Sequence, residues 1–182
     1  MKEKVYVIHG YGADSESNFF PWLKQKLNSD NIECNVLDLP NTNYPKLNEW
    51  IEYINKNVSE LNENIYFVGH SLGCISVLKF LSQFNKNSKI GGLILVSGFD
   101  EKLPLFPTLN SFVSDKIDYS KIINMTQKIT VIASQDDDLV PIEYSWELSK
   151  NLKSKFLKLN GYGHFLVLDL PIVYEILKKW FF

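Results

Sequence analysis

Short apolar runs rich in β-branched residues recur along the chain, and longer segments with a different periodicity separate them. Continuous apolar runs of this length are typical of strands that are buried on both faces of a parallel sheet. The runs predict strands at Val5–Ile8, Cys34–Leu37, Ile65–Val68, Leu93–Val96 and Ile129–Ala133, with a weaker sixth at Phe156–Leu159.

The segments between these runs carry apolar residues at the spacing of amphipathic helices. The stretch from Ser71 to Phe84 is apolar on a broad face, as expected for a helix packed against a sheet. The narrower apolar faces consist of Phe20, Leu23 and Leu27; of Leu47, Trp50, Ile51, Ile54 and Val58; and of Val173, Ile176, Leu177 and Trp180. Alternating strands and helices predict an α/β fold, a three-layer α/β/α sandwich around a mostly parallel sheet of about six strands.

One segment, from Gly98 to Asp118, interrupts this alternation. It contains Pro104 and Pro107 and is longer than an ordinary connection between two elements. Long loops in compact domains are often functional, so residues 98–118 are predicted to form a short cap-like insertion. A short helix at 119–125, capped by Asp118, is expected to complete the crossover. With this insertion, residues 1–182 are predicted to form a single domain.

The composition is that of an ordinary globular domain, with 45% hydrophobic residues, 22% charged residues and a net charge of −2. No block of lysines and arginines is present, so neither nucleic acid nor a membrane is expected as a partner. The sequence shows no apolar signal-peptide region, which favours a cytoplasmic location. Cys34 and Cys74 lie in apolar surroundings and are expected to be reduced and buried. The oligomeric state is left open.

The first predicted strand ends in His9-Gly10-Tyr11-Gly12, a turn that suits two kinds of site. A glycine-rich turn after a strand can cradle the pyrophosphate of a dinucleotide, and Asp38 would then bind the ribose. Such a turn can also supply a backbone N–H group to an oxyanion hole. The dinucleotide motif is incomplete, because Ser15 stands where a third glycine is required.

The third predicted strand runs into Gly69-His70-Ser71-Leu72-Gly73, which fits the pattern G-x-S-x-G. This pattern places a serine on a sharp strand-to-helix turn, where the flanking glycines leave room for a strained backbone. The serine oxygen then stands clear at the carboxyl end of the sheet, and Ser71 becomes the candidate nucleophile. The N–H of Leu72 is one expected oxyanion donor and the N–H of Tyr11 is the other. This pairing favours the oxyanion interpretation of the opening turn and leaves Asp38 as a loop acid.

A serine needs a base to act as a nucleophile, and the base needs an orienting acid. The sharp turn at residues 69–73 is called the serine elbow. Only one of the three histidines, His164, lies downstream of it, in a loop after the last predicted strand. Asp136, Asp137 and Asp138 follow the fifth predicted strand and are the candidate acids. They lack the alternating oxygen ligands and the glycine of a calcium loop, so no metal is expected.

These motifs together resemble those of a known family. The turn HGYG with NFFPWL soon after it, GHSLG, DDDLVP and GYGHF resemble the α/β-hydrolases, and within them the small serine hydrolases related to retinoblastoma-binding protein 9 and the bacterial YdeN group. The resemblance implies a compact hydrolase without a large lid and without a cofactor. It also implies that the acid lies four residues before Pro141, at Asp137. Asp138 departs from the family pattern, which keeps Asp136, Asp138 and the more remote Asp100 as alternatives.

The expected reaction is the cleavage of small carboxylic esters, or of related amide or thioester bonds, through an acyl-enzyme. The insertion is too short to enclose a long lipid chain, and Leu105, Phe106 and Phe112 are predicted to line a small apolar pocket. Phe19 is assigned either to the core or to a wall of this pocket. The alternative function is that of a protein-interaction module on a hydrolase scaffold, with little turnover.

Overall fold

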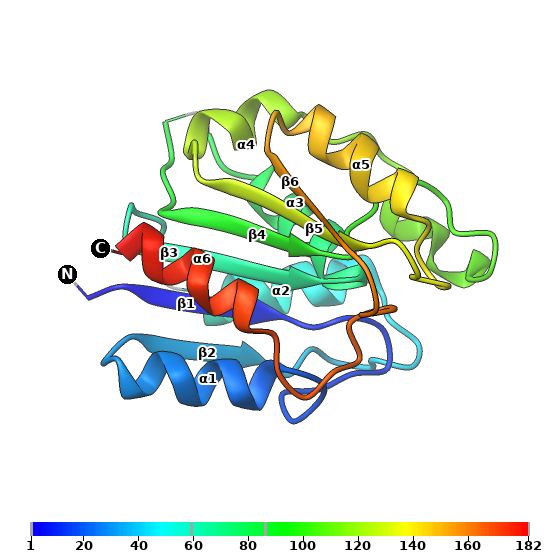
Figure 1. The fold of residues 1–182 in the computed structure, drawn as a ribbon. Helices are drawn as coiled ribbons and strands as arrows, with labels where there is room; N and C mark the ends of the chain where they lie inside the picture. Colours follow the sequence, from blue (N-terminus) through cyan, green and yellow to red (C-terminus); the bar gives the residue numbers. More distant parts are fainter. Residues whose placement is uncertain (1, 59, 86, 182) are drawn as a thin grey trace.

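The computed structural model describes residues 2–58, 60–85 and 87–181 and is built around a six-stranded sheet (Figure 1). All neighbouring strands are parallel, and their order across the sheet is β2-β1-β3-β4-β5-β6. The six predicted strands are confirmed, each within two residues of its expected bounds. They are β1 (Lys4–Ile8), β2 (Glu33–Leu37), β3 (Ile65–His70), β4 (Gly92–Val96), β5 (Ile129–Ser134) and β6 (Lys155–Leu159).

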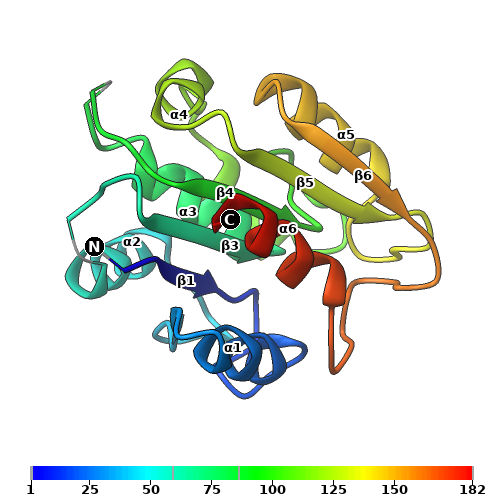
Figure 2. The ribbon, with the colours of Figure 1, turned by 60° about the vertical axis from the view of Figure 1, so that its left-hand side comes forward.

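Helices cover both faces of the sheet and confirm the three-layer α/β/α arrangement (Figures 1 and 2). The helices α1 (Phe20–Ser29) and α6 (Pro171–Phe181) share one face and contact each other. The helices α2 (Leu47–Asn57), α3 (Leu72–Leu81) and α5 (Ile142–Asn151) pack on the opposite face. In the part of the chain that the structure describes, none of the helices is both long enough and apolar enough to cross a membrane.

Side chains of each strand alternate between the two apolar cores that the helices enclose. On β1, Val5 and Val7 pack with α1 and α6, whereas Tyr6 and Ile8 pack with α2 and α3. Because both faces are covered, every residue of β3, β4 and β5 is buried, which explains their continuous apolar runs. The edge strands β2 and β6 keep exposed charged residues at Glu33, Lys155 and Lys158. The parallel arrangement brings the carboxyl ends of all strands to one edge of the sheet, where the connecting loops meet.

The insertion after β4 contains a 3₁₀ helix, η1 (Pro107–Val113), and is followed by α4 (Tyr119–Met125). Asp118 caps α4, because its carboxylate accepts a hydrogen bond of 3.1 Å from the N–H of Ser120. The bounds of α4 and its cap are as predicted. The buried side chains of η1 pack against α3, so the insertion lies close to the helix that follows the serine elbow.

The helix α5 and the end of α3 differ from the expectations. The apolar pattern predicts no helix at 142–151, because the buried face of α5 includes the small polar residues Ser145 and Ser149 beside Leu148. Apolar periodicity does not detect a face of this kind. The helix after the elbow ends at Leu81, three residues before the expected Phe84.

Both cysteines are buried and free of disulfide bonds, as predicted. Burial raises the pKa of the Cys34 thiol to about 12. Burial also raises the pKa of Cys74, whose sulfur donates to the carbonyl of Val96. Both thiols are therefore protonated members of the core rather than nucleophiles.

Candidate active site at the carboxyl edge of the sheet

Ser71 stands between β3 and α3 in a backbone conformation that L residues rarely adopt. Its φ of 53° and ψ of −122° lie in a region that is open mainly to glycine. The helix starts directly after this turn and lies close to β1, since a Cβ on Gly73 would be 2.1 Å from the carbonyl oxygen of Ile8. The G-x-S-x-G pattern thus folds as the expected strand, sharp turn and helix.

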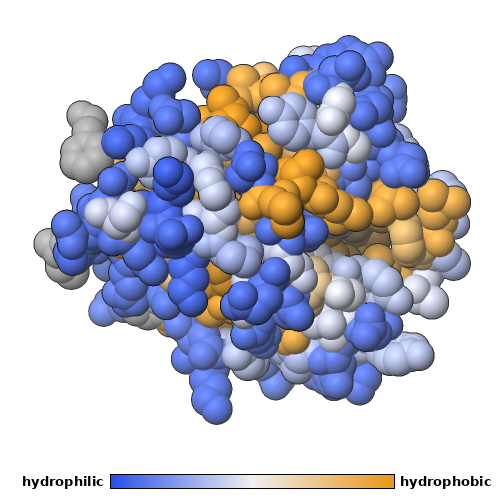
Figure 3. All heavy atoms as spheres, turned by 60° about the horizontal axis from the view of Figure 1, so that its bottom comes forward, coloured by the Kyte–Doolittle hydropathy of each residue, from blue (hydrophilic) through white to orange (hydrophobic). Residues whose placement is uncertain are grey.

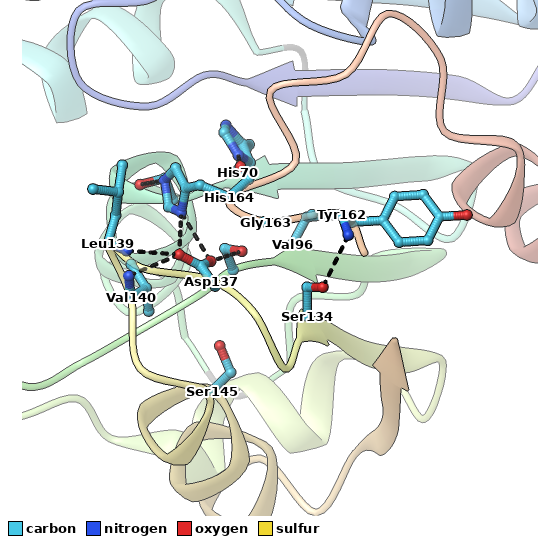
Figure 4. Close-up of polar contacts among 12 residues, drawn as sticks. His70, Val96, Ser134, Asp137, Leu139, Val140, Ser145, Tyr162, Gly163 and His164 are labelled. Atoms are coloured by element: carbon cyan, nitrogen blue, oxygen red, sulfur yellow. Dashed lines mark hydrogen bonds and ion pairs between the residues drawn. The ribbon is translucent and has the colours of Figure 1, made fainter. Parts of the chain in front are cut away.

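His164 reaches Ser71 from the loop between β6 and α6. Its Nε2 is 2.9 Å from Oγ of Ser71. Its Nδ1 is 2.9 and 3.1 Å from the carboxylate oxygens of Asp137 (Figure 4). Each ring nitrogen has one kind of partner, so Nδ1 donates to the carboxylate and Nε2 accepts from the hydroxyl. The side chain of His164 is 9% exposed and that of Asp137 is 1% exposed, so little water reaches the pair.

The carboxylate of Asp137 is held by several donors. It accepts hydrogen bonds from the N–H groups of Leu139 and Val140, at 3.0 and 2.9 Å, and from Oγ of Ser97 at 2.7 Å. Burial alone would raise the pKa of Asp137, but the hydrogen bond and charge of His164, together with these donors, lower it. Asp137 therefore stays ionised. Sequence reasoning missed Ser97, whose only signal is its position directly after a strand.

Asp136 contacts the loop of His164 rather than its ring. Its carboxylate accepts from Oγ of Ser134 and from the N–H groups of Gly161 and Gly163, at 2.8 and 3.3 Å. These hydrogen bonds, that of Ser134 above all, lower the pKa of Asp136. The residue is therefore a carboxylate with a partner set of its own, and it is not the acid next to the imidazole.

The two remaining acidic candidates lie apart from His164. Asp138 is exposed and makes no hydrogen bond or ion pair within the described residues. Asp100 accepts a hydrogen bond from the hydroxyl of Tyr119, and burial together with this contact raises the pKa of the phenol. Of the four acids considered, Asp137 is the one that the structure places against the imidazole. Within residues 2–58, 60–85 and 87–181, no three His, Cys, Asp or Glu side chains are grouped as metal ligands.

His70, inside the elbow, holds the backbone of His164. Its Nε2 lies 2.9 Å from the carbonyl oxygen of His164 and must carry the proton, since a carbonyl only accepts. Its Nδ1 is buried without a partner in the part of the chain described. Burial and the nearby His164 lower the pKa of His70 to about 3, so the ring stays neutral. Sequence analysis assigned no role to this histidine.

The turn after β1 lies against the serine. A Cβ on Gly10 would be only 3.0 Å from Cβ of Ser71, so glycine permits the close approach. Tyr11 belongs to this turn, and Leu72 is the first residue of α3, where backbone N–H groups lack helical partners. The placement suits two N–H groups near the serine, and their role as oxyanion donors stays a prediction.

Buried and polar side chains fix this turn. Nε2 of His9 accepts from the N–H of Leu39 at 3.0 Å, and Nδ1 donates to the carbonyl of Gly10 at 2.9 Å. Burial lowers the pKa of His9, which keeps this neutral tautomer. Asp38 accepts from the N–H and Oγ of Ser15, at 2.7 and 3.0 Å, and thus fastens the loop that follows the turn.

A cavity of about 290 Å³ opens beside Ser71 and His164. This volume is near the lower end for small-molecule pockets, at about 300 Å³. The described residues that line it include no Asp, Glu, Lys or Arg. Exposed apolar side chains, among them Tyr11 and Leu166, also occur beside the opening, and Figure 3 shows apolar surface on this side of the molecule. The apolar wall consists of Leu103, Phe106, Leu109, Leu139, Val140 and Leu166.

Of the four residues considered for the pocket, Phe106 lines this cavity and the other three do not. For Phe19, the structure agrees with the alternative assignment to the core. Phe19 and Phe112 are fully buried and pack against other core rings, so neither side chain reaches the cavity. Leu105 is 65% exposed and lies outside the lining. An apolar residue in an irregular segment has no periodicity that indicates the direction of its side chain, so the sequence did not distinguish Leu105 from Phe106.

Comparison with known proteins agrees with the fold. The profile of the serine hydrolase family matches residues 5–172. The protein YdeN of Bacillus subtilis (strain 168) is 39% identical over 185 residues, covering 100% of this chain and 97% of YdeN. The crystal structure of the B. subtilis ydeN gene product has a TM-score of 0.95 at 38% identity and covers 99% of both chains. Est1E from Butyrivibrio proteoclasticus, with a TM-score of 0.71 and 19% identity over 99% of this chain and 87% of its own, shares the fold.

Proposed function

Because the chain belongs to the serine hydrolase family and has the α/β-hydrolase fold, we propose that it cleaves small carboxylic esters. The observation that carries this proposal is the hydrogen-bonded series from Ser71 through His164 to Asp137. In the proposed reaction Ser71 is the nucleophile, His164 the general base and Asp137 the orienting acid. This chemistry requires no cofactor.

The reaction has two stages. Oγ of Ser71 attacks the ester carbonyl while Nε2 of His164, 2.9 Å away, takes the hydroxyl proton. The ester C–O bond then breaks, His164 returns the proton to the departing alcohol, and the acyl group stays on Ser71. Water next attacks this acyl-enzyme and gives its proton to His164. The proton returns to Ser71 as the carboxylic acid leaves, while ionised Asp137 stabilises each imidazolium.

Negative charge on the substrate oxygen would be stabilised by the N–H groups of Tyr11 and Leu72. Leu72 begins α3, so the partial positive charge at the N-terminus of that helix adds to the hydrogen bond. The close approach of Gly10 to Ser71 supports a position of Tyr11 on the opposite side of the carbonyl.

The walls of the cavity support a small, neutral substrate. An apolar, uncharged lining next to Ser71 favours a neutral acyl group, because a buried ionic group would lose its hydration without an ion pair. The cavity volume of about 290 Å³ favours a short acyl group. Amides and thioesters of the same size would use the same residues.

A fluorophosphonate probe and intact-mass measurement test the proposal. Wild-type protein should gain one adduct, Ser71→Ala none, and His164→Ala an adduct formed much more slowly. Ser145→Ala is the matched control, because it removes a buried hydroxyl that donates to the carbonyl of Gly98. Folded wild-type protein without an adduct would contradict the proposal and favour the interaction module.

A further inference from the structure

Three adjacent carboxylates after β5 have three different environments. Asp137 faces the ring of His164, whereas Asp138 is exposed and has no polar partner among the described residues. Asp136 is also exposed, yet its carboxylate accepts three hydrogen bonds. Of these three acids, the reaction proposed above uses Asp137 alone. It assigns no role to the hydrogen bonds of Asp136.

Asp136 and Ser134 together hold three consecutive backbone N–H groups. The carboxylate accepts from Gly161 at 2.8 Å and from Gly163 at 3.3 Å. Oγ of Ser134 accepts from the intervening N–H of Tyr162 at 3.2 Å (Figure 4). The same hydroxyl donates to the carboxylate of Asp136. The three residues directly before His164 are thus tied to the end of β5.

Packing does not fix the two glycines of this segment. A Cβ placed on Gly161 or on Gly163 would have no heavy atom within 4 Å. Both glycines, and Phe165 beyond His164, have positive φ angles of 84°, 50° and 56°. Beyond His164, the buried side chain of Phe165 anchors the chain in the core. Before His164, a backbone with two glycines in open surroundings has many alternative conformations. The hydrogen bonds to Asp136 and Ser134 therefore restrain residues 161–163, while His70 holds the carbonyl of His164.

We propose that Asp136 is a positioning residue for the esterase reaction, because it fixes the loop that places His164 between Ser71 and Asp137. The inference rests on the proposed function. An ionised carboxylate suits this role, since it only accepts and can bind several N–H groups with charge-assisted hydrogen bonds. The three acids then have different roles: Asp137 orients the ring of His164, Asp136 holds the backbone that precedes it, and Asp138 has no role in the reaction.

Asp136→Asn tests the proposal, with Asp138→Asn as its control. Both variants remove one charge from the same exposed turn. Only in Asp136→Asn does an NH₂ group replace one of two oxygens that accept hydrogen bonds, so that a donor faces a donor. Misplacement of a catalytic group by about 1 Å can slow a reaction about 100-fold, so we expect kcat to fall by about ten- to hundredfold in Asp136→Asn. KM should change little, because the variant leaves the pocket lining intact. Asp138→Asn should match the wild type in both constants.

Proton NMR supplies a second readout that needs no substrate. In the wild type, the Nδ1 proton of His164 shared with Asp137 should give a resolved downfield resonance. This resonance should broaden or disappear in Asp136→Asn and persist in Asp138→Asn. Equal kcat values and equal resonances in the two variants would overturn the positioning role.

Ser134→Ala covers the case in which Asp136→Asn fails to fold. It keeps the carboxylate, removes the acceptor for Tyr162 N–H and should lower kcat in the same direction. Unchanged kcat in folded Ser134→Ala would then overturn the proposal. The experiments also distinguish failure of the proposed function from failure of the positioning role. Wild-type protein without a fluorophosphonate adduct contradicts the proposed function, whereas equal labelling rates in wild type and Asp136→Asn contradict the positioning role.

Discussion

Ser97 donates a hydrogen bond of 2.7 Å from Oγ to Oδ2 of Asp137, the same oxygen that lies 2.9 Å from Nδ1 of His164. Ser97 is fully buried, so no bulk water would replace its hydroxyl. A hydrogen bond to a charged group contributes about 1.5–3 kcal/mol, and a partial loss in the transition state would slow the reaction about tenfold in Ser97→Ala. Steady-state kcat with an ester that the wild type cleaves measures this loss.

Ser145→Ala is the control for that experiment. It removes another fully buried hydroxyl, which donates to the carbonyl of Gly98 at 2.7 Å. Both variants should lose stability, but only Ser97→Ala should lose activity. If the two variants had the same kcat, the hydrogen bond to Asp137 would have no part in the reaction.

Asp137→Asn should be nearly inactive. An amide opposite Nδ1 favours the wrong tautomer of His164 and removes the charge that stabilises the imidazolium, an effect of about 10³- to 10⁴-fold on kcat. Asp138→Asn, a neighbouring change of the same kind, should keep full activity. Activity in Asp137→Asn close to that of the control would exclude Asp137 as the orienting acid.

His70 should make the folded state less stable in mild acid. Its pKa is lowered from 6.5 to about 3, mainly by burial, so the unfolded chain binds a proton that the folded chain does not. The contribution of His70 to the free energy of unfolding is therefore unchanged above pH 6.5 and becomes less favourable as the pH decreases from 6.5 toward 3. His70→Gln keeps a donor for the carbonyl of His164 but does not titrate.

Urea unfolding at about pH 7 and about pH 5 compares the two proteins, and each unit of pKa difference corresponds to about 1.4 kcal/mol. The wild type should lose more stability than His70→Gln over this interval. His9 also has a lowered pKa, but it is present in both proteins, so the difference isolates His70. Parallel pH dependences would contradict this account.

Gly73→Ala should destabilise the protein strongly. The new Cβ would lie 2.1 Å from the carbonyl oxygen of Ile8 and 2.6 Å from that of His9, both backbone atoms of β1 and its turn. The helix would have to move off the sheet, at a cost of about 3 kcal/mol or more. Gly161→Ala is the control: it meets no atom within 4 Å and should cost about 1 kcal/mol through its φ of 84°. Equal melting temperatures would argue against the close contact.

Phe106→Ala should change the preferred acyl length. The ring of Phe106 lines the cavity, whereas its neighbour Leu105 is exposed and does not. Values of kcat/KM for a series of esters should peak at short acyl chains in the wild type and shift to longer ones in Phe106→Ala. Leu105→Ala should keep the wild-type profile. A steady rise toward long chains in the wild type would contradict the assignment of small esters.

The fold was predictable because its signals are local. Apolar runs mark strands covered on both faces, and the spacing around Ser71 specifies a strand, a turn and a helix. The helix α5 was missed because small serines form part of its buried face. When small polar side chains form part of the buried face of a helix, the buried and exposed faces differ too little in hydrophobicity for periodicity to reveal the helix.

The site was predictable only where one residue type was scarce. His164 is one of three histidines, and its loop position singles it out. The residues alone do not distinguish Asp136, Asp137 and Asp138, because the direction of each carboxylate depends on the turn that follows β5. Ser97 lies 40 residues from its partner, and only the adjacency of β4 and β5 brings the two together.

The positive φ of Ser71 has a consequence for the whole molecule. A non-glycine residue held at φ 53° and ψ −122° stores about 1–3 kcal/mol of strain, which a glycine would not. Thermal stability therefore favours glycine at position 71, whereas the proposed catalysis requires serine there. A library screened only for survival at high temperature would accumulate glycine there, and its best members would be inert.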